Sequence, residues 1–309
     1  MIPAAASAPS RIPTELYQDI IQHISTPHLA ALCTVSSTLR HETERVLYRT
    51  VQLTEARRIR SWSITIAGSE RLAVMVHSLT LTRVHSANVD RDTICVQESL
   101  RIALRNVINL KYLKIIGRYE HGHSYLHPNI FLGRPFRLRG LSGDLTTNEA
   151  DGLKFLSEQP DIHSWSVGLP FLFLPLAMTR TIPGVILPHL SELNLDMSQM
   201  LAYIPKWPLR GLAICFKHFE AYRPDGMDKL RLFRDTLISL RFNGYHASFD
   251  QLEQHILLIA ESVPKLKHLK CRTVVCGNSH MVRFFFIADR PLYIESLVSF
   301  TIYETFYHI

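Results

Sequence analysis

The sequence has few cysteines, no glycine-rich loop and no long hydrophobic run. Five scattered cysteines in 309 residues, with no secretory signal at the start, argue against a disulfide scaffold and favour reduced thiols. The most apolar run, Gly168 to Met178, is about half of the roughly 20 residues that a membrane span needs, and it contains two prolines. We therefore expect a protein of the cytoplasm or nucleus that does not bind membranes.

Motifs of common enzymes are also missing. The sequence contains no G-x-x-x-x-G-K-[ST], no G-x-S-x-G and no H-E-x-x-H, so we expect neither enzymatic activity nor a cofactor. His121, His123 and His127 fall in a stretch broken by glycine and proline, which favours a solvated loop over a metal site. Cys271 and Cys276 lack a second pair at zinc spacing. An enzyme with an unfamiliar site would need a deep pocket of titratable groups.

Basic residues exceed acidic ones, 34 Lys and Arg against 27 Asp and Glu, which gives a net charge of +7. Because these residues are spread along the chain and form no block, nucleic-acid binding is not expected. One arginine-rich stretch, with Arg118, Arg134, Arg137 and Arg139, is a candidate contact for an acidic or phosphorylated protein target, since guanidinium groups match such oxygens.

A repeat is the strongest signal that is present: apolar, two residues, apolar, one residue, apolar. The first positions of successive copies are most often 28 residues apart. The clear copies are Val76-Leu79-Leu81, Leu110-Leu113-Ile115, Ile162-Trp165-Val167, Leu190-Leu193-Leu195, Leu209-Leu212-Ile214, Leu237-Leu240-Phe242 and Leu266-Leu269-Cys271, with weaker copies starting at Leu138 and Ile294. This periodicity assigns residues 73–309 to one repeat domain.

Each copy predicts a half-buried strand, because its last two apolar residues are two apart. Helices are expected between strands, since Thr146 with Glu149 and Ser248 with Gln251 fit capping boxes. Strands that alternate with helices pair in parallel and stack. The predicted fold class is therefore an α/β solenoid with a parallel sheet, and the alternative is an ordinary closed α/β domain.

The repeat domain resembles irregular leucine-rich repeats, although Arg118 and Ser198 stand where the family's asparagine ladder would fall. The resemblance implies that strands line a concave face and that this face holds another protein. Candidate substrate-binding positions, chosen because they alternate with buried ones, are Tyr112, Lys114, Glu192, Asn194, Arg241 and Lys270.

The amino-terminal region has a different pattern. Residues 1–10 form a flexible tail, residues 11–54 carry three short amphipathic helices, and residues 55–72 connect them to the repeats. Pro27 separates the first helix from the second, and the third begins near Ser36 or Ser37. Three helices in so few residues are close to the lower limit for independent folding, so part of their apolar surface should belong to a partner.

Ile12-Pro13-x-Glu15-Leu16 and the apolar residues after it resemble an F-box, and the whole chain resembles an F-box protein of the fungal type with irregular leucine-rich repeats. The resemblance implies a substrate receptor of an SCF-type, cullin-RING ubiquitin ligase. Adaptor-binding residues would be Ile12, Pro13, Leu16, Ile20, Ile21, Ile24, Leu29, Leu32 and Val35. The alternative is a scaffold outside any ligase, in which these helices merely cap the solenoid.

Overall fold

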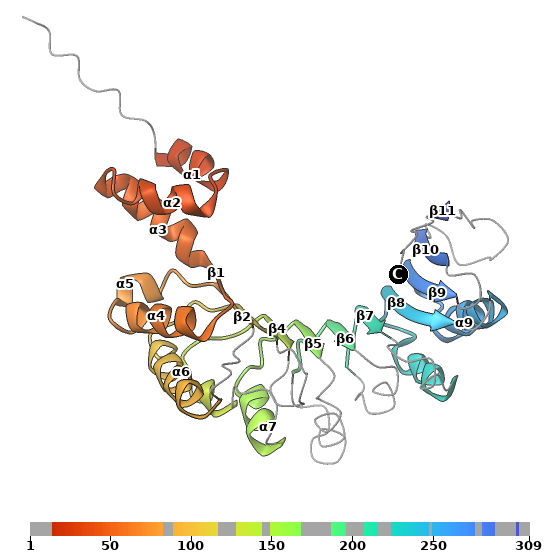
Figure 1. The fold of residues 1–309 in the computed structure, drawn as a ribbon. Helices are drawn as coiled ribbons and strands as arrows, with labels where there is room; N and C mark the ends of the chain where they lie inside the picture. Colours follow the sequence, from red (N-terminus) through yellow and green to blue (C-terminus); the bar gives the residue numbers. More distant parts are fainter. Residues whose placement is uncertain are drawn as a thin grey trace, which may run out of the picture.

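The computed structural model describes residues 14–82, 89–116, 128–143, 149–167, 187–195, 207–215, 224–246, 249–275, 280–287 and 301–302. Helical elements precede or cover a single sheet (Figure 1). The elements are α1 (Thr14–Gln22), α2 (Thr26–Leu32), α3 (Ser37–Arg49), β1 (Thr50–Leu53), α4 (Ala56–Ala67), α5 (Glu70–Ala73), β2 (Ser78–Thr82), α6 (Val89–Ala103), β3 (Tyr112–Ile116), η1 (Pro128–Ile130), β4 (Gly140–Gly143), α7 (Glu149–Ser157), β5 (Ser164–Val167), β6 (Glu192–Leu195), β7 (Gly211–Cys215), η5 (Pro224–Phe233), β8 (Ser239–His246), α9 (Phe249–Ser262), β9 (His268–Val275), β10 (His280–Ile287) and β11 (Thr301–Ile302).

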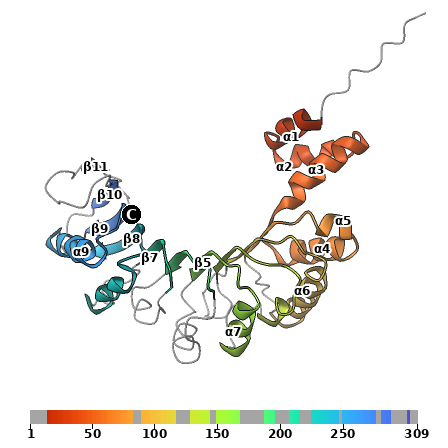
Figure 2. The same cartoon turned by 180° about the vertical axis from the view of Figure 1, so that it is seen from behind.

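Helices α1, α2 and α3 form a small module at the amino-terminal end of the sheet (Figures 1 and 2). Pro27 lies in the first turn of α2, where its missing N–H costs no helical hydrogen bond. The Oγ of Ser36 accepts a hydrogen bond of 3.2 Å from the backbone N–H of Leu39 and so caps α3. Ile21 and Leu29 are buried, and α1 and α2 both pack on α3.

Helix α3 runs directly into β1, so the module and the sheet share one continuous stretch of chain. β1 pairs in parallel with β2, which places the start of the sheet at Thr50, inside the predicted helical region. Tyr48 stands where the other copies of the repeat have an aliphatic residue and packs against the main core. This aromatic substitution conceals the first strand from a search for leucine-like residues.

Strands β1 to β9 pair in parallel in sequence order and form a continuous curved sheet. Equivalent positions of the repeat lie side by side, so the second apolar residue of each copy forms a buried row across the sheet. That row is Leu79, Leu113, Leu141, Trp165, Leu193, Leu212, Leu240 and Leu269. The predicted α/β solenoid with a parallel sheet is confirmed, because the nine parallel strands follow one another in sequence order and β1 stands at the edge of the described sheet and does not pair with β9 to close a barrel.

The helices α4, α6, α7 and α9 lie on the outer side of the arc, and the strands line its inner side (Figures 1 and 2). Polar side chains join neighbouring repeats between the helices and the strands. Asn106 donates a hydrogen bond to the carbonyl of Ala67 at 3.2 Å, and Asn109 donates one to the carbonyl of Val74 at 2.7 Å. These two bonds satisfy backbone acceptors at the end of the preceding repeat. Helices α7 and α9 begin at Glu149 and Phe249, close to the predicted starts.

The sheet ends differently from the prediction. β10 pairs antiparallel with β9, and β11 pairs antiparallel with β10. Only four residues separate Val275 from His280, and a parallel connection needs a crossover of about a dozen residues or more, so the chain can only turn back. The repeat copy predicted at Ile294 lies outside the described residues.

Candidate protein-interaction surfaces

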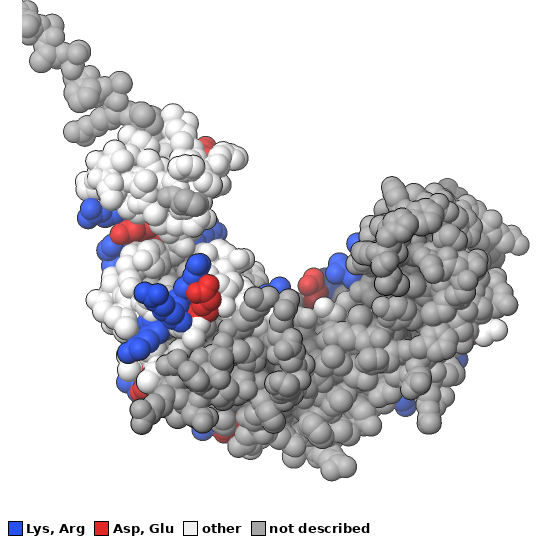
Figure 3. Space-filling model, viewed as in Figure 1, with Lys and Arg blue, Asp and Glu red and all other residues white. Residues whose placement is uncertain are grey.

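The amino-terminal module exposes large apolar side chains. Leu16 and Ile20 on α1 are 50% and 53% exposed, and Val35, between α2 and α3, is 65% exposed. Leu16 and Ile20 are four residues apart and therefore lie on the same face of the helix. In Figure 3 the outer part of the module carries few charged atoms on the side that faces the viewer. A helical face with few charged groups and half-exposed aliphatic residues is typical of a protein contact.

The other predicted adaptor residues differ in exposure. Ile21 and Leu29 are buried in the module itself, and Ile24 and Leu32 are half-buried. Ile12 and Pro13 lie outside the described residues. The predicted set therefore divides into residues that hold the three helices together and residues that remain available to a partner.

An ion pair joins the module to the solenoid. Arg71 on α5 donates to the carboxylate of Glu44 on α3, and Glu44 is the more buried of the two. Burial raises the pKa of the Tyr48 hydroxyl, and the charge of Glu44 raises it further. Tyr48, Glu44 and Arg71 thus lie together where α3 meets α5, at the boundary between the module and the solenoid.

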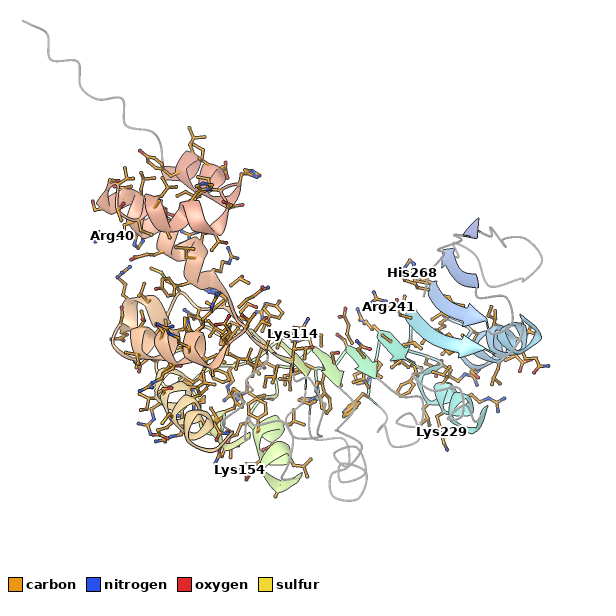
Figure 4. The ribbon with its side chains drawn as sticks, in the orientation of Figure 1. Arg40, Lys114, Lys154, Lys229, Arg241 and His268 are labelled. Carbon is orange, nitrogen blue, oxygen red and sulfur yellow. The ribbon has the colours of Figure 1, made fainter. Side chains whose placement is uncertain are left out.

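The six predicted substrate-binding residues are all exposed, and the register brings them into two rows. Tyr112 and Glu192 belong to the row at the first strand position, whereas Lys114, Asn194, Arg241 and Lys270 share the third position. Figure 4 shows Lys114 and Arg241 on the inner side of the arc and Lys154 on its outer, helical side. Alternation along each strand therefore places the predicted residues on one face.

Small neighbours position two of these side chains. A Cβ atom on Gly140 would lie 2.8 Å from the ring Cδ1 of Tyr112, so the tyrosine ring rests directly over glycine backbone of the next strand. Glu192 extends similarly over Gly211, where an added Cβ atom would lie 3.4 Å from the Cγ of Glu192. Asn194 donates a hydrogen bond of 3.1 Å to the hydroxyl of Ser166. These contacts restrict the side chains before any partner binds, which lowers the entropy cost of binding.

Sequence reasoning missed a further row at the residue that precedes each strand. Its carbonyl accepts two backbone N–H groups from the next strand: Lys111 accepts from Arg139 at 2.7 Å and from Gly140 at 3.0 Å. The same pair of bonds recurs at each step from His77 to Ile238, so these residues adopt one geometry. With the equivalent positions at the two ends, the strand-entry row is Arg49, His77, Lys111, Arg139, His163, Ser191, Arg210, Ile238 and Lys267.

Two of the four arginines in the predicted arginine-rich stretch have a structural role. Arg134 donates to the carbonyl of Ile130 at 2.8 Å, and Arg137 donates to that of Glu158 at 2.7 Å. Burial lowers the pKa of Arg134, and nearby arginines lower it further. Of the four predicted arginines, Arg139 is the one that belongs to the strand-entry row, whereas Arg118 lies outside the described residues.

The described ranges contain no group of three or more His, Cys, Asp or Glu residues placed to hold a metal ion. Cys276 and the histidines at 121, 123 and 127 lie outside those ranges. Within the same ranges, every helix is too short or too polar to cross a bilayer.

Known proteins match this chain in structure but not in sequence. No family model matches the chain, and no curated protein matches its sequence. Among solved structures, the chain is similar to the leucine-rich repeat-containing protein LegL7 from Legionella pneumophila, with 11% identity and a TM-score of 0.46 over 89% of this chain and 90% of that one. Because these values are low, the assignment of the fold rests on the sheet and its register.

Proposed function

We propose that the protein is a substrate receptor of an SCF-type ubiquitin ligase, in which α1 and α2 bind the adaptor and the inner face of the sheet binds a protein target. The observation that carries the proposal is the exposure of Leu16, Ile20 and Val35 on a module that projects from a solenoid. Solenoids with a long inner face commonly bind other proteins. The chain would contribute proximity, by holding target lysines near a ubiquitin carrier, and no chemistry of its own.

The magnitude of the contact supports adaptor binding. Full burial of an aliphatic side chain is worth about 1.5–3 kcal/mol, and Leu16, Ile20 and Val35 retain half or more of their exposure, so about 1–2 kcal/mol each remains to be gained. Three such residues together supply roughly 3–5 kcal/mol, a factor of about 100 or more in affinity. This gain adds to whatever the half-buried Ile24 and Leu32 contribute at the edge of the interface.

The alternative is a protein-interaction scaffold that never joins a ligase. Burial of Ile21 and Leu29 within the module favours it, since these side chains reach a partner only if the helices repack. The two functions share the solenoid and differ in the partner of α1 and α2. A test of the adaptor therefore separates them.

The test is co-expression with an SCF-type adaptor followed by affinity purification. Leu16→Glu combined with Ile20→Glu places two carboxylates on the exposed face of α1, and Ile64→Glu is the matched control, because Ile64 is 61% exposed on α4. A stoichiometric complex with wild type and the control, and none with the double variant, supports the receptor function. The absence of a complex with wild type, or equal binding of the double variant, contradicts the receptor function.

Deletion of residues 1–54 is a poor substitute for these variants. It would remove β1 and leave the hydrogen-bonding edge of β2 unpaired, so loss of binding would not distinguish a lost contact from a damaged sheet.

A further inference from the structure

The residues at the entry of the strands form a line of positive charge. Arg49, Lys111, Arg139, Arg210 and Lys267 occupy equivalent positions, with His77, His163, Ser191 and Ile238 at the intervening ones. Parallel strands lie about 4.8 Å apart, so Lys111, just before β3, and Arg139, just before β4, have backbones closer together than a Debye length of about 8 Å at physiological salt. None of the five forms an ion pair with a residue in the described ranges. Like charges in this arrangement repel one another.

The neighbouring inner-face rows add to this charge. Lys114, Arg241 and Lys270 stand at the third strand position. Glu192 is the acidic residue of these rows in the described parallel strands. The chain as a whole is nearly balanced, with 34 basic and 27 acidic residues, so the two inner-face rows and the strand-entry row beside them are together selectively basic. Figure 4 shows Arg241 and His268 on this side toward the carboxyl-terminal strands.

We propose that the inner face binds an extended, acidic segment of a protein partner, an inference that rests on the proposed role of this face in holding a target. Carboxylates spaced along such a segment would relieve the repulsion within the strand-entry row. From β3 to β9 the row crosses six strand spacings, roughly 29 Å, which an extended segment of about nine residues covers.

A protein segment fits this face better than a nucleic acid. Proteins that bind single strands offer successive aromatic side chains for base stacking, and Tyr112 is the exposed aromatic residue of the described inner-face rows. The middle of the face instead has short polar or small side chains, such as Ser142, Ser166 and Ala213. They leave room for side chains and hydrogen bonds of a polypeptide.

The test measures fluorescence anisotropy of labelled probes with the full chain. The first probe is a peptide of about 12 residues in which Asp or Glu alternates with Gly or Ser. The second replaces each acid by its amide, and the third is a single-stranded oligothymidylate of matched charge. Binding at low salt, about 50 mM, is compared with binding at about 300 mM, where screening is stronger. The amide peptide reports contacts that do not depend on charge.

Two sets of variants carry the same change in net charge. Arg139→Glu, Arg210→Glu and Lys267→Glu together reverse three charges of the strand-entry row. Lys154→Glu, Lys229→Glu and Arg231→Glu together reverse three charges on α7 and η5, and Figure 4 shows Lys154 and Lys229 away from the inner face. Glu192→Gln removes the acidic residue of the inner face without adding strain, since glutamine has the same shape.

We expect the acidic peptide to bind and the amide peptide to bind at least about tenfold more weakly, with affinity falling as salt rises. The strand-entry triple should lose about tenfold or more, the control triple less than about threefold, and Glu192→Gln should bind about two- to fivefold more tightly. Equal loss in both triples, no binding at low salt, or tighter binding of the oligothymidylate would each overturn the proposal. Adaptor binding by the same preparations is a separate readout, so failure here leaves the receptor function to its own test.

Discussion

Gln159 offers a sharp test of how neighbouring repeats are joined beneath the inner face. Its side chain is 1% exposed. The Oε1 atom accepts a hydrogen bond of 2.8 Å from the backbone N–H of Leu138, and the Nε2 atom donates to the carbonyl of Phe136 at 3.4 Å. These two bonds hold the segment that leads to Arg139 and β4. We predict that Gln159→Leu, which keeps the volume but removes both bonds, destabilises the solenoid.

The cost follows from the groups that lose their partners. An unsatisfied buried N–H costs about 1–3 kcal/mol, and the longer bond to Phe136 adds less than about 1 kcal/mol. Leucine buries no polar amide and so recovers part of this, which leaves a net loss of about 2–3 kcal/mol. That is a large share of the roughly 5–15 kcal/mol by which a typical domain is stable.

Urea unfolding followed by circular dichroism measures the loss, and hydrogen exchange locates it. Because each repeat contacts only its neighbours, faster exchange should concentrate in β4 and β5. Gln52→Leu is the matched control, since Gln52 is exposed on β1 and its replacement should change stability by less than about 0.5 kcal/mol. Wild-type stability in Gln159→Leu would refute the reasoning.

Three further predictions concern other parts of the chain. Gly143→Ala should abolish folding or cost more than about 4 kcal/mol in thermal unfolding, because the φ of Gly143 is 111° and a Cβ would overlap the carbonyl of the adjacent strand. Gly133→Ala, with open space around it, should cost only about 1 kcal/mol. Similar losses of stability in the two variants would contradict this prediction. Arg71→Ala should change stability by less than about 1 kcal/mol but broaden the distribution of distances between spin labels on α1 and α6. Arg58→Ala, which breaks the ion pair with Glu55 at the start of α4, should leave that distribution unchanged. Burial and a neighbouring carboxylate raise the pKa of the Cys33 thiol, so less thiolate is present near neutral pH. Iodoacetamide should therefore modify Cys33 more slowly in the folded chain than in the urea-unfolded chain, as measured by peptide mass mapping. Equal rates in the two states would argue against the packing around Cys33.

The sequence predicted the repeated strands because their apolar residues recur at fixed offsets, and parallel register follows directly from that recurrence. It did not reveal β1, because Tyr48 replaces an aliphatic residue there, or β10, whose apolar residues follow no repeat. Both departures occur at the ends of the parallel sheet, where no further repeat stacks on the strand and the repeat pattern is relaxed.

The charge of the inner face shows more clearly what a reading of the sequence alone does not predict. Lys111 and Arg139 are 28 residues apart in the chain and adjacent in the sheet, so a charge that is dispersed along the sequence becomes concentrated in space. A search at the residue after the first apolar position of each copy would have found this row. The role of Gln159, by contrast, depends on which backbone groups the fold leaves unpaired, and no local pattern reports that.

The exposed face of the amino-terminal module could be predicted only as a set of candidates. Helical spacing placed Leu16 and Ile20 together, but it gave no means to tell them from Ile21, which packs inward. The division between support and contact depends on how α1 and α2 pack on α3, which is a tertiary property.

The central claim is that this module binds an SCF-type adaptor while the solenoid keeps its inner face free for a target. Hydrogen exchange of the full chain with and without the adaptor tests it most directly. The account predicts a complex of one chain with one adaptor, in which protection rises across residues 14–35 and stays unchanged in strands β3 to β8. Protection confined to those strands, or no change anywhere at saturating adaptor, would contradict it.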